Sequence, residues 1–481
     1  MPLYRTRFQR WLILFVLCAG AALGGLYIYG SQQTLPAKFT VSGWMVGGYK
    51  VDQFRQQLEQ KLQALNQQVI TLQSPTPEMA TKELTFNQLG LVVQKQELDT
   101  LLQGLFEAPL RHRIWNRWHM RAPHIQLNIQ FDSQKLSASV EQAWKELYKN
   151  KPTPAKRIIT PANEVIYEPE IPTARIHTDK LREQLNALIP QIDTLKAPAL
   201  SLRTTLPIYQ KLPDVTVDLL KSQGIERKIM ESTTFFPPTS AEGRIHNIRS
   251  TAESIQDLIL KPGEVFDYSQ IIARTEAKYG YQEAPVILNG KLVPGIGGGI
   301  CQVSTTLYHA VLRSGLEIVE RRNHSLPISY APLGQDATYS SGYINFKFRN
   351  NTGAYLLIRT STSANQVTVQ FFGRMPDNIT YEIESTILQT LQPDTKYVHN
   401  PTLGQGKQEK LSEGKVGFVV ETYRYKKDKG ITLSKELISK DRYSPQPTLI
   451  ATNSGEPLPN GVQQPQGDSI LEDGVKGPNF R

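Results

Sequence analysis

The pattern of apolar and polar positions divides the chain into stretches of different character. An uncharged apolar run, Trp11–Gly30, comes first and is about as long as a bilayer requires. Over residues 36–231, short alternating stretches are interleaved with stretches whose apolar residues recur at helical spacing. This pattern predicts one or two small α+β domains.

The clearest helix in residues 36–231 is Val51–Leu65, because Phe54, Leu58 and Leu62 form an apolar stripe along it. A strand-then-helix order follows and recurs. The expected strands are residues 69–72, 83–85, 125–131 and 158–167, and the further expected helices are residues 97–105, 134–147 and 178–188.

Residues 232–373 have a second α+β pattern with a mostly antiparallel sheet. Ser250 and Glu253 are spaced as a capping box, which predicts a short helix through Leu258. Residues 281–294 predict a hairpin that turns at Asn289-Gly290. Further strands are expected at residues 316–320, 343–348, 356–360 and 366–372.

The last third of the chain is β-rich and then polar. Over residues 379–453, three stretches have the pattern of strands joined by turns. In residues 454–481, Pro, Gly, Gln and Asp dominate, which predicts a disordered tail. The expected fold is therefore α+β: a single N-terminal transmembrane helix, small α+β repeats, a central α+β domain and a small all-β module.

One stretch of the central domain has the features of a functional site. Gly297, Gly298 and Gly299 make a loop that can adopt positive φ and let another backbone come close. Cys301 follows at the start of a predicted helix with one apolar face. The helix dipole there lowers the pKa of a thiol and favours the reactive thiolate.

The motifs around Cys301 resemble those of the VanW family, and the resemblance extends over residues 232–373. The motifs are Gly297-Gly-Gly-Ile-Cys-Gln-Val-Ser-Thr-Thr-Leu-Tyr308, Glu320-Arg-Arg-Asn-His-Ser-Leu-Pro-Ile-Ser-Tyr330 and Gly334-Gln-Asp-Ala-Thr338.

Both flanking regions carry resemblances of their own. Residues 36–231 are similar to the YoaR-like peptidoglycan-binding region that often precedes a VanW domain, with Asn87-Gln-Leu-Gly-Leu91 as a local motif. Residues 379–453 resemble a small adhesion module named for its glycines. These resemblances imply a protein that engages peptidoglycan or another anionic cell-wall polymer.

Cys301 could act as a nucleophile if a base holds or removes its proton. His324 is the nearest imidazole within a motif, and Asp336 could select its tautomer. The order Cys, His, Asp is similar to that of papain-like and NlpC-type cysteine peptidases, although the spacing here is tighter. Gln302 or the Cys301 backbone N–H could supply an oxyanion hole.

Structural roles for the same residues are an open alternative. Cys301 could be a small buried hydrophobe, and His324 and Asp336 could close turns. The paired ligand spacings of zinc sites are missing, so neither a metal nor a cofactor is expected. The residues that could hold a ligand are Gly297, Gly298, Gly299, Gln302, Ser304, Thr305, Arg321 and Arg322, of which the arginines suit a carboxylate or phosphate.

The net charge of the chain and its expected membrane topology both limit which partners the protein can have. Lys and Arg number 54 against 44 Asp and Glu, and the net charge of +10 favours anionic partners. Basic residues precede the apolar run, so the positive-inside rule places residues 1–10 in the cytoplasm, residues 11–30 in the membrane and the rest outside. A cleaved signal peptide is the alternative. With Cys18 in the membrane, Cys301 is a lone exported thiol.

The stretch Arg111–Arg121 interleaves Arg, His and Trp. Aromatic rings among cations can hold sugars or lipid head groups. The alternative, which we prefer, is a solvated Arg-rich linker whose Trp residues pack inward. Nucleic acid is not an expected partner of an exported, tethered chain.

Two functions are left open by the sequence. The first is a non-catalytic wall-binding protein held in the cell membrane, which explains the anchor, the basic charge and the modular chain. The second is a cysteine-dependent peptidase or transpeptidase on cell-wall stem peptides, which explains the lone thiol and its glycine loop. Both describe a membrane-anchored, VanW-like protein that engages peptidoglycan.

Overall fold

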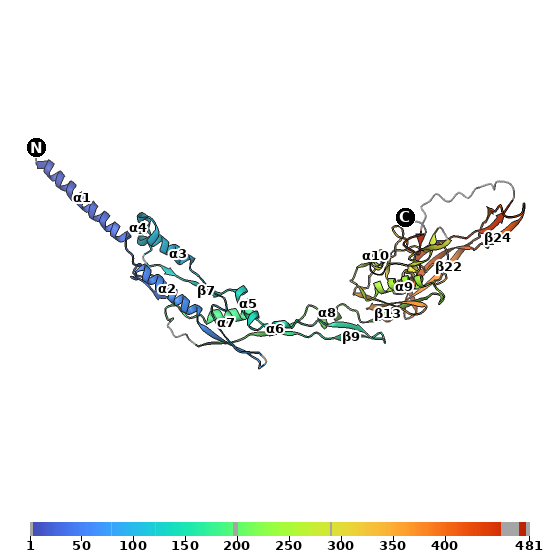
Figure 1. Ribbon diagram of the computed structural model, residues 1–481, viewed down its shortest axis with the longest axis horizontal. Coiled ribbons are helices and arrows are strands. Elements are labelled where there is room, and N and C mark those ends of the chain that lie inside the picture. The colour runs from blue at the N-terminus through green and yellow to red at the C-terminus, as the bar shows by residue number, and fades with distance from the viewer. Residues whose placement is uncertain are drawn as a thin grey trace. The chain divides into compact units, whose positions relative to one another are not determined.

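The computed structural model describes residues 3–77, 79–120, 122–195, 201–288, 291–453 and 471–477 (Figure 1). The chain divides into two compact units, one of residues 1–154 and 170–214 and the other of residues 155–169 and 215–481. Each unit has its own hydrophobic cores. The predicted α+β class is confirmed, with small, mostly antiparallel sheets in both units.

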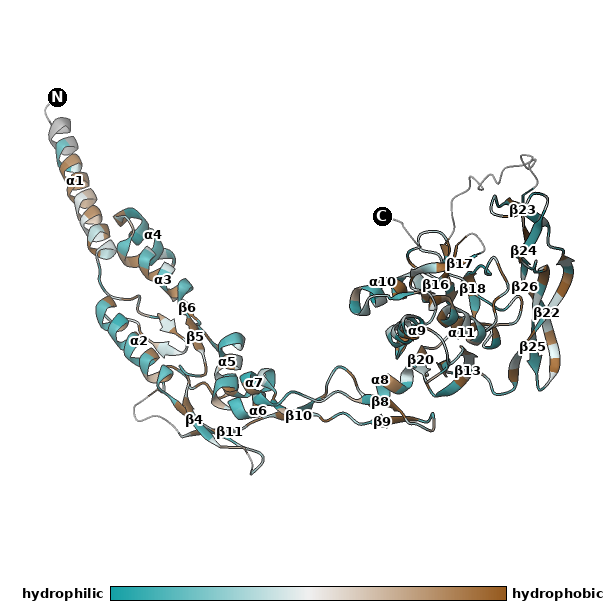
Figure 2. Cartoon of the chain, turned by 45° about the vertical axis from the view of Figure 1, so that its right-hand side comes forward, coloured by the Kyte–Doolittle hydropathy of each residue, from teal (hydrophilic) through white to brown (hydrophobic). Residues whose placement is uncertain are grey.

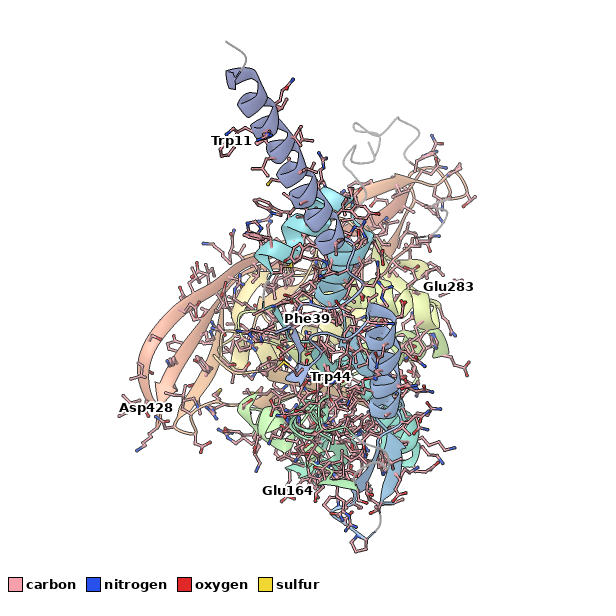
Figure 3. The ribbon with its side chains drawn as sticks, turned by 90° about the vertical axis from the view of Figure 1, so that its left-hand side faces the viewer. Trp11, Phe39, Trp44, Glu164, Glu283 and Asp428 are labelled. Carbon is pink, nitrogen blue, oxygen red and sulfur yellow. The ribbon has the colours of Figure 1, made fainter. Side chains whose placement is uncertain are left out.

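The first unit begins with helix α1, Leu3–Gly30. Its part Gln9–Gly30 is long and apolar enough to cross a membrane, with a mean hydropathy of 2.2. Large apolar side chains such as Trp11 are exposed along it (Figure 3). A signal sequence near an N-terminus has the same length and composition, so these features fit both a membrane anchor and a signal sequence.

The rest of the first unit packs around two hydrophobic cores. In one, helix α2 (Val51–Asn66) buries its predicted stripe near Phe39 and Trp44, both labelled in Figure 3. In the other, Phe86 and Phe131 meet edge to face, with ring centroids 5.1 Å apart. Two cores in one unit match the expected small α+β repeats.

The helices of this unit after α2 are α3 (Gln96–Leu102), the π-helix η1 (Gln103–Glu107), α4 (Leu110–His119), α5 (Ser133–Ala143), α6 (Lys145–Lys149) and α7 (Thr178–Ala187). Its strands are β1 (Thr40–Val41), β2 (Trp44–Met45), β3 (Val69–Gln73), β4 (Lys82–Thr85), β5 (Leu91–Gln94), β6 (His124–Ile125), β7 (Asn128–Phe131), β10 (Thr173–Ile176), β11 (Leu202–Thr205) and β12 (Ile208–Lys211).

Helix α4 holds most of the Arg–Trp stretch, whose residue 121 lies outside the described residues. Arg117 is buried and donates hydrogen bonds to the carbonyls of Gln32 and Thr34, just after α1. Trp115 and Trp118 are 63% and 57% exposed. The prediction that the Trp residues pack inward is therefore wrong, because the guanidinium of Arg117 takes the inward position.

The second unit contains the Cys301 stretch. Its helices are α8 (Val217–Ser222), α9 (Glu242–Ile255), α10 (Tyr268–Tyr279) and α11 (Ile300–Arg313). Its strands are β8 (Lys156–Ile159), β9 (Val165–Glu168), β13 (Arg227–Phe235), β14 (Leu258–Leu260), β15 (Val265–Asp267), β16 (Glu283–Leu288), β17 (Lys291–Ile296), β18 (Glu317–Glu320), β19 (Lys347–Arg349), β20 (Leu356–Thr362), β21 (Gln366–Gly373), β22 (Ile379–Leu391), β23 (Thr395–His399), β24 (Gln408–Ser412), β25 (Gly417–Asp428), β26 (Ile431–Tyr443), β27 (Thr448–Thr452) and β28 (Leu471–Glu472).

Helix α11 is the centre of this unit. It packs against β13 and β21 of the antiparallel sheet β13-β21-β20-β14 and also contacts β22 of the β-rich region (Figure 2). Every residue from Ile300 to Leu312 is buried. The sequence predicted one apolar face, but the helix is covered on all sides, and its polar side chains hydrogen-bond inside the unit: Thr306 to Thr234 of β13, and Ser304 to the carbonyl of Ala337.

The predicted helix with Ser250 as its N-cap is wrong. Helix α9 begins at Glu242, and Ser250 lies buried inside it. The hydroxyl of Thr251 donates to the carbonyl of Asn247 at 2.8 Å, one turn back. Hydroxyls inside a helix can bond in this way, so a Ser-x-x-Glu pattern does not by itself mark a helix start.

The hairpin predicted at residues 281–294 is confirmed by the antiparallel pairing of β16 with β17. Its expected turn, Asn289-Gly290, lies outside the described residues. The strand expected at residues 343–348 is shorter and later, since β19 begins at Lys347. Residues 379–453 form two three-stranded sheets, β22-β25-β26 and β23-β27-β24, in agreement with the expected all-β module.

The predicted disordered tail is only partly described. Residues 454–470 and 478–481 lie outside the described residues. For residues 471–477 the prediction is wrong, because β28 pairs with β16 and buries Glu472 and Asp473. Composition could not show this, since the residues that bind and pack against the segment are distant from it in sequence.

Candidate functional site

The glycine loop places Cys301 in the first turn of α11. Gly297 and Gly299 have φ of 96° and 106°, values that favour glycine. A Cβ on Gly298 would lie 2.3 Å from the carbonyl oxygen of Pro285. The predicted roles of these glycines, positive φ and close approach of another backbone, therefore both occur in the structure.

Cys301, His324 and Asp336 lie together in the core of the second unit. Nδ1 of His324 is 2.7 Å from Oδ2 of Asp336, and the same oxygen accepts the His324 backbone N–H at 2.7 Å. Nε2 of His324 has no hydrogen-bond partner among the described residues, and the Cys301 thiol lies close enough to the ring to raise the pKa of His324. The sulfur accepts the backbone N–H of Tyr339 at 3.0 Å. The residues predicted as a catalytic set are thus neighbours, and their chemistry stays a prediction.

Burial and charge shift the pKa values of this set in different directions. Burial opposes a charge on His324, but Asp336 and Cys301 together raise the pKa of His324 well above its ordinary value. Burial would raise the pKa of Asp336, yet His324 and Arg321 lower it to about 2. Both directions favour an imidazolium held by a carboxylate.

The thiol has the opposite tendency to the one that the helix dipole predicts. Burial raises the pKa of Cys301, and the nearby carboxylate of Asp473 raises it further, while His324 acts against both. Oδ1 of Asp473 accepts the backbone N–H groups of Gly299 and Cys301 at 3.0 and 2.8 Å. An anion therefore already occupies the N-terminus of α11.

A pocket of about 630 Å³ lies next to this anion. Arg244, Gln302 and Asp473 line one part of it, and Oδ2 of Asp473 accepts a hydrogen bond from Arg244 at 3.3 Å. Phe235 and Leu326 are among its apolar lining residues. Its size and mixed lining are typical of small-molecule and peptide sites.

Comparisons with known proteins identify the two domains that build this site. Residues 243–372 match the family model described as VanW like protein, and residues 382–453 match that of the G5 domain. The chain carries a VanW domain followed by a G5 domain. The resemblance of the central region to VanW and that of the glycine-named module are thereby confirmed, and the combination fits a cell-wall-associated protein.

Relatives of this chain are similar over part of their length. The uncharacterized protein YoaR of Bacillus subtilis is 35% identical over 165 residues, which are 34% of this chain and 53% of YoaR. The vancomycin B-type resistance protein VanW of Enterococcus faecalis is 29% identical over 161 residues, 32% of this chain and 58% of that protein. The chain thus spans about half the length of the curated relatives it matches.

Among solved structures, an IgA1 protease G5 domain is 24% identical and has a TM-score of 0.14. The match covers 16% of this chain and 89% of that structure.

The G5 domain holds the Asp336 loop of the VanW domain in place. The hydroxyl of Tyr443 donates to Oδ1 of Asp336 and accepts the backbone N–H of Gly334 at 2.7 Å. Asp441 accepts two hydrogen bonds from Nη1 of Arg321, at 2.6 and 2.7 Å. Nε of Arg321 donates to the carbonyl of Asp336 at 2.6 Å. Side chains from the G5 domain therefore complete the surroundings of the His324 partner.

The residues predicted to bind a ligand fall into two groups. Gly297, Gly298, Gly299 and Gln302 surround the occupied N-terminus of α11, and Gln302 accepts a hydrogen bond from Arg244. The other residues have structural partners or lie away from the helix start. The hydroxyls of Ser304 and Thr305 bond the backbone of Ala337. Arg321 is buried in its ion pairs, and Arg322 is exposed.

Several residues of the site were missed by the sequence analysis. Arg244, Asp473, Asp441 and Tyr443 come from elements far from Cys301 in sequence and carry no motif. Tyr330 lies within a quoted motif, and its ring stands edge-on to that of His324 with centroids 6.4 Å apart. His309, a second imidazole on α11, is buried.

The described residues contain no group of three or more His, Cys, Asp or Glu side chains that could hold a metal ion.

The charge on His324 gives a testable prediction. In the native chain we expect the His324 ring to be protonated at about pH 7, while buried His309, whose pKa burial and Arg313 lower to about 4, stays neutral. Asp336→Asn removes the carboxylate that opposes the burial cost, so His324 should lose its proton at the same pH. NMR of carbon-labelled imidazole rings in the full chain measures both. A ring of His324 that stays charged in Asp336→Asn would contradict this account, and His309 serves as the neutral reference.

Proposed function

We propose that this is an envelope protein, held in the cell membrane by residues 11–30, that engages peptidoglycan through its VanW domain. The observation that carries the proposal is the pocket of about 630 Å³ beside the N-terminus of α11, which both domains line. In this proposal residues 36–231 are the YoaR-like peptidoglycan-binding region, residues 232–373 the VanW domain and residues 379–453 the adhesion module.

The pocket suits a wall stem peptide for reasons of charge and shape. Arg244 and Lys415 supply cations from the VanW and G5 domains, and stem peptides carry carboxylates. Phe236 and Phe418 supply apolar surface for the body of a ligand. A cationic, partly apolar pocket favours an acidic peptide over a neutral sugar chain.

The first unit supports a membrane location for the chain. Arg117 of α4 holds the backbone just after α1, and exposed Trp115 and Trp118 lie on the same short helix. Trp side chains are enriched at membrane interfaces, where one side of the ring is apolar and the other is wet. An α4 helix lying at the interface fits an uncleaved α1 better than a removed signal peptide, with residues 1–10 in the cytoplasm and the rest of the chain outside.

A second candidate function, a cysteine peptidase or transpeptidase on stem peptides, is favoured by the closeness of the Cys301 thiol to the His324 ring. The thiolate would attack a peptide carbonyl to form a thioester, and the imidazolium of His324 would protonate the leaving amine. Water would then release an acid, or an amine of a second stem would form a new peptide bond. The N–H groups of Gly299 and Cys301 would stabilise the oxyanion once Asp473 leaves.

Binding is tested by sedimentation of the full chain with purified peptidoglycan. Arg244→Ala should weaken binding about tenfold or more, because a stem carboxylate loses its partner in the pocket. Arg249→Ala, an exposed residue of the same helix, is the matched control and should bind as the native chain does. If both variants bind peptidoglycan as strongly as the native chain, the pocket is not the peptidoglycan site.

Chemistry is tested on the same incubations by mass spectrometry of the released stem peptides. If Cys301 transfers or hydrolyses stem peptides, the native chain changes their masses, whereas Cys301→Ala binds peptidoglycan and leaves the masses unchanged. The preparation must contain a Cys301 that an alkylating reagent can reach. If such a native chain leaves the masses unchanged, the enzyme hypothesis is rejected and the binding hypothesis is retained.

The anchor is tested on membranes from cells that express the full chain. We expect the protein to remain in membranes after alkaline extraction and its mass to include residues 1–30, because α1 stays in the bilayer. Protease added outside spheroplasts should digest everything beyond α1. A mature N-terminus within or after residues 11–30, together with release by alkali, would establish a cleaved signal peptide instead.

A further inference from the structure

The C-terminal segment, residues 471–476, lies across the site as a third strand. β28 pairs antiparallel with β16, with Glu472 opposite Ile287. Further along, Val475 donates its N–H to the carbonyl of Ile296 at 2.8 Å, and Ile296 donates to the carbonyl of Lys476 at 2.7 Å. The hairpin that precedes Cys301 therefore holds the segment by its backbone on both sides of Asp473, as a sheet edge does, while Asp473 itself turns with a φ of 57°.

Two acidic side chains of the segment are bound at buried positions. Asp473 accepts the N–H groups of Gly299 and Cys301 and an N–H of Arg244. Glu472 accepts the backbone N–H of Ser325 at 3.0 Å and its hydroxyl at 2.8 Å. Each acidic residue is only 6% exposed. The groove thus provides donors for carboxylates at two defined places.

The glycines of the groove match the backbone of the segment. A Cβ on Gly295 would lie 2.7 Å from the carbonyl oxygen of Lys476, and a Cβ on Gly297 would lie 3.0 Å from the N of Val475. Side chains at these positions would push the segment away. The loop that the sequence marks as open to another backbone is filled here by the backbone of the chain itself.

The occupied groove also leaves an unused donor. The buried hydroxyl of Tyr330 has no hydrogen-bond partner among the described residues. Its ring lies beside His324 and under the guanidinium of Arg244, 6.0 Å from ring centroid to guanidinium carbon. A buried polar group without a partner costs stability, so the site is not fully satisfied by the C-terminal segment.

We propose that the C-terminal segment is a built-in occupant of a groove for a wall peptide, whose carboxylate takes the place of Asp473 when the segment leaves. The inference deepens the proposed function, since it states how the ligand of that pocket is held and what covers Cys301 before it binds. The segment blocks access to the thiol, and its carboxylate disfavours the thiolate.

Exchange of the segment for a ligand is physically reasonable. The regular pairing of β28 with β16 includes two residue pairs, and both acidic side chains lose hydration on burial. A separate peptide with a carboxylate at the position of Asp473 would accept the same hydrogen bonds. It could also form a hydrogen bond with the hydroxyl of Tyr330. Binding of such a ligand shifts the equilibrium toward the open groove by mass action.

The first test measures the rate at which iodoacetamide alkylates Cys301 in the full chain. The chain carries Cys18→Ser, so Cys301 is the one thiol that can be alkylated. Asp473→Ala should raise the rate at least about tenfold, because the segment loses its hydrogen bonds to the start of α11. Asp218→Ala, an exposed residue of the same unit, is the matched control and should not change the rate. An unchanged rate in Asp473→Ala would overturn the inference.

A second variant separates release of the segment from loss of the fold. A chain that ends at Ile470 should be alkylated quickly, and the synthetic peptide Leu-Glu-Asp-Gly-Val-Lys should slow its alkylation again. The same peptide with Asp473→Ala should not. A misfolded chain could not be protected in this sequence-dependent way, so fast labelling that the native peptide fails to reverse would overturn the inference.

A muropeptide with a free stem carboxylate distinguishes the inference from the proposed function. If it slows alkylation of the chain that ends at Ile470, the groove takes wall peptides and both are supported. If the hexapeptide protects and the muropeptide does not, the built-in occupant stands, while the wall ligand and with it the proposed function are overturned.

Discussion

The structure of the second unit depends on the burial of the N-terminus of α11. A helix start has backbone N–H groups without partners in the helix, and burial removes the water that would otherwise bind them. Here Asp473 supplies one oxygen to two of these groups, and Arg244 neutralises the carboxylate. A buried helix start therefore requires hydrogen-bond acceptors, and here the carboxylate of Asp473 supplies them.

The same requirement explains why so many charges lie deep in the unit. Asp336 accepts hydrogen bonds from His324 and Tyr443, and Arg321 is shared between Asp336 and Asp441. Asp336 and Asp441 thus have Arg321 as a partner of the opposite sign, which is the condition under which such buried charges are tolerated, whereas Glu472 is held by the N–H and hydroxyl of Ser325. Because the partners come from both domains, the position of His324 beside Cys301 depends on the G5 domain as well as on the VanW domain.

The sequence predicted those parts of the fold and of the site that lie in local patterns. The stripe of α2 follows from helical spacing, the β16–β17 hairpin from alternation and turn residues, and the Cys301, His324 and Asp336 set from motifs. Arg244 and Asp473 could not be found in this way, because a single charged residue has no periodic signal and its partner is distant in the chain. Ser250 shows the converse error, since a local pattern was satisfied inside a helix by bonds to the preceding turn.

The VanW and G5 domains are best understood as one structural unit, since cutting the chain between them would leave Arg321 without Asp441 and Asp336 without Tyr443. Removing one partner of a buried ion pair costs roughly 3–5 kcal/mol, against a total stability of roughly 5–15 kcal/mol for a typical domain. The pocket would lose one wall at the same time, because Lys415 and Phe418 line it from the G5 side. A module that only added affinity for the wall would need neither contact. The contacts therefore give the G5 domain a part in building the surroundings of Asp336 and His324.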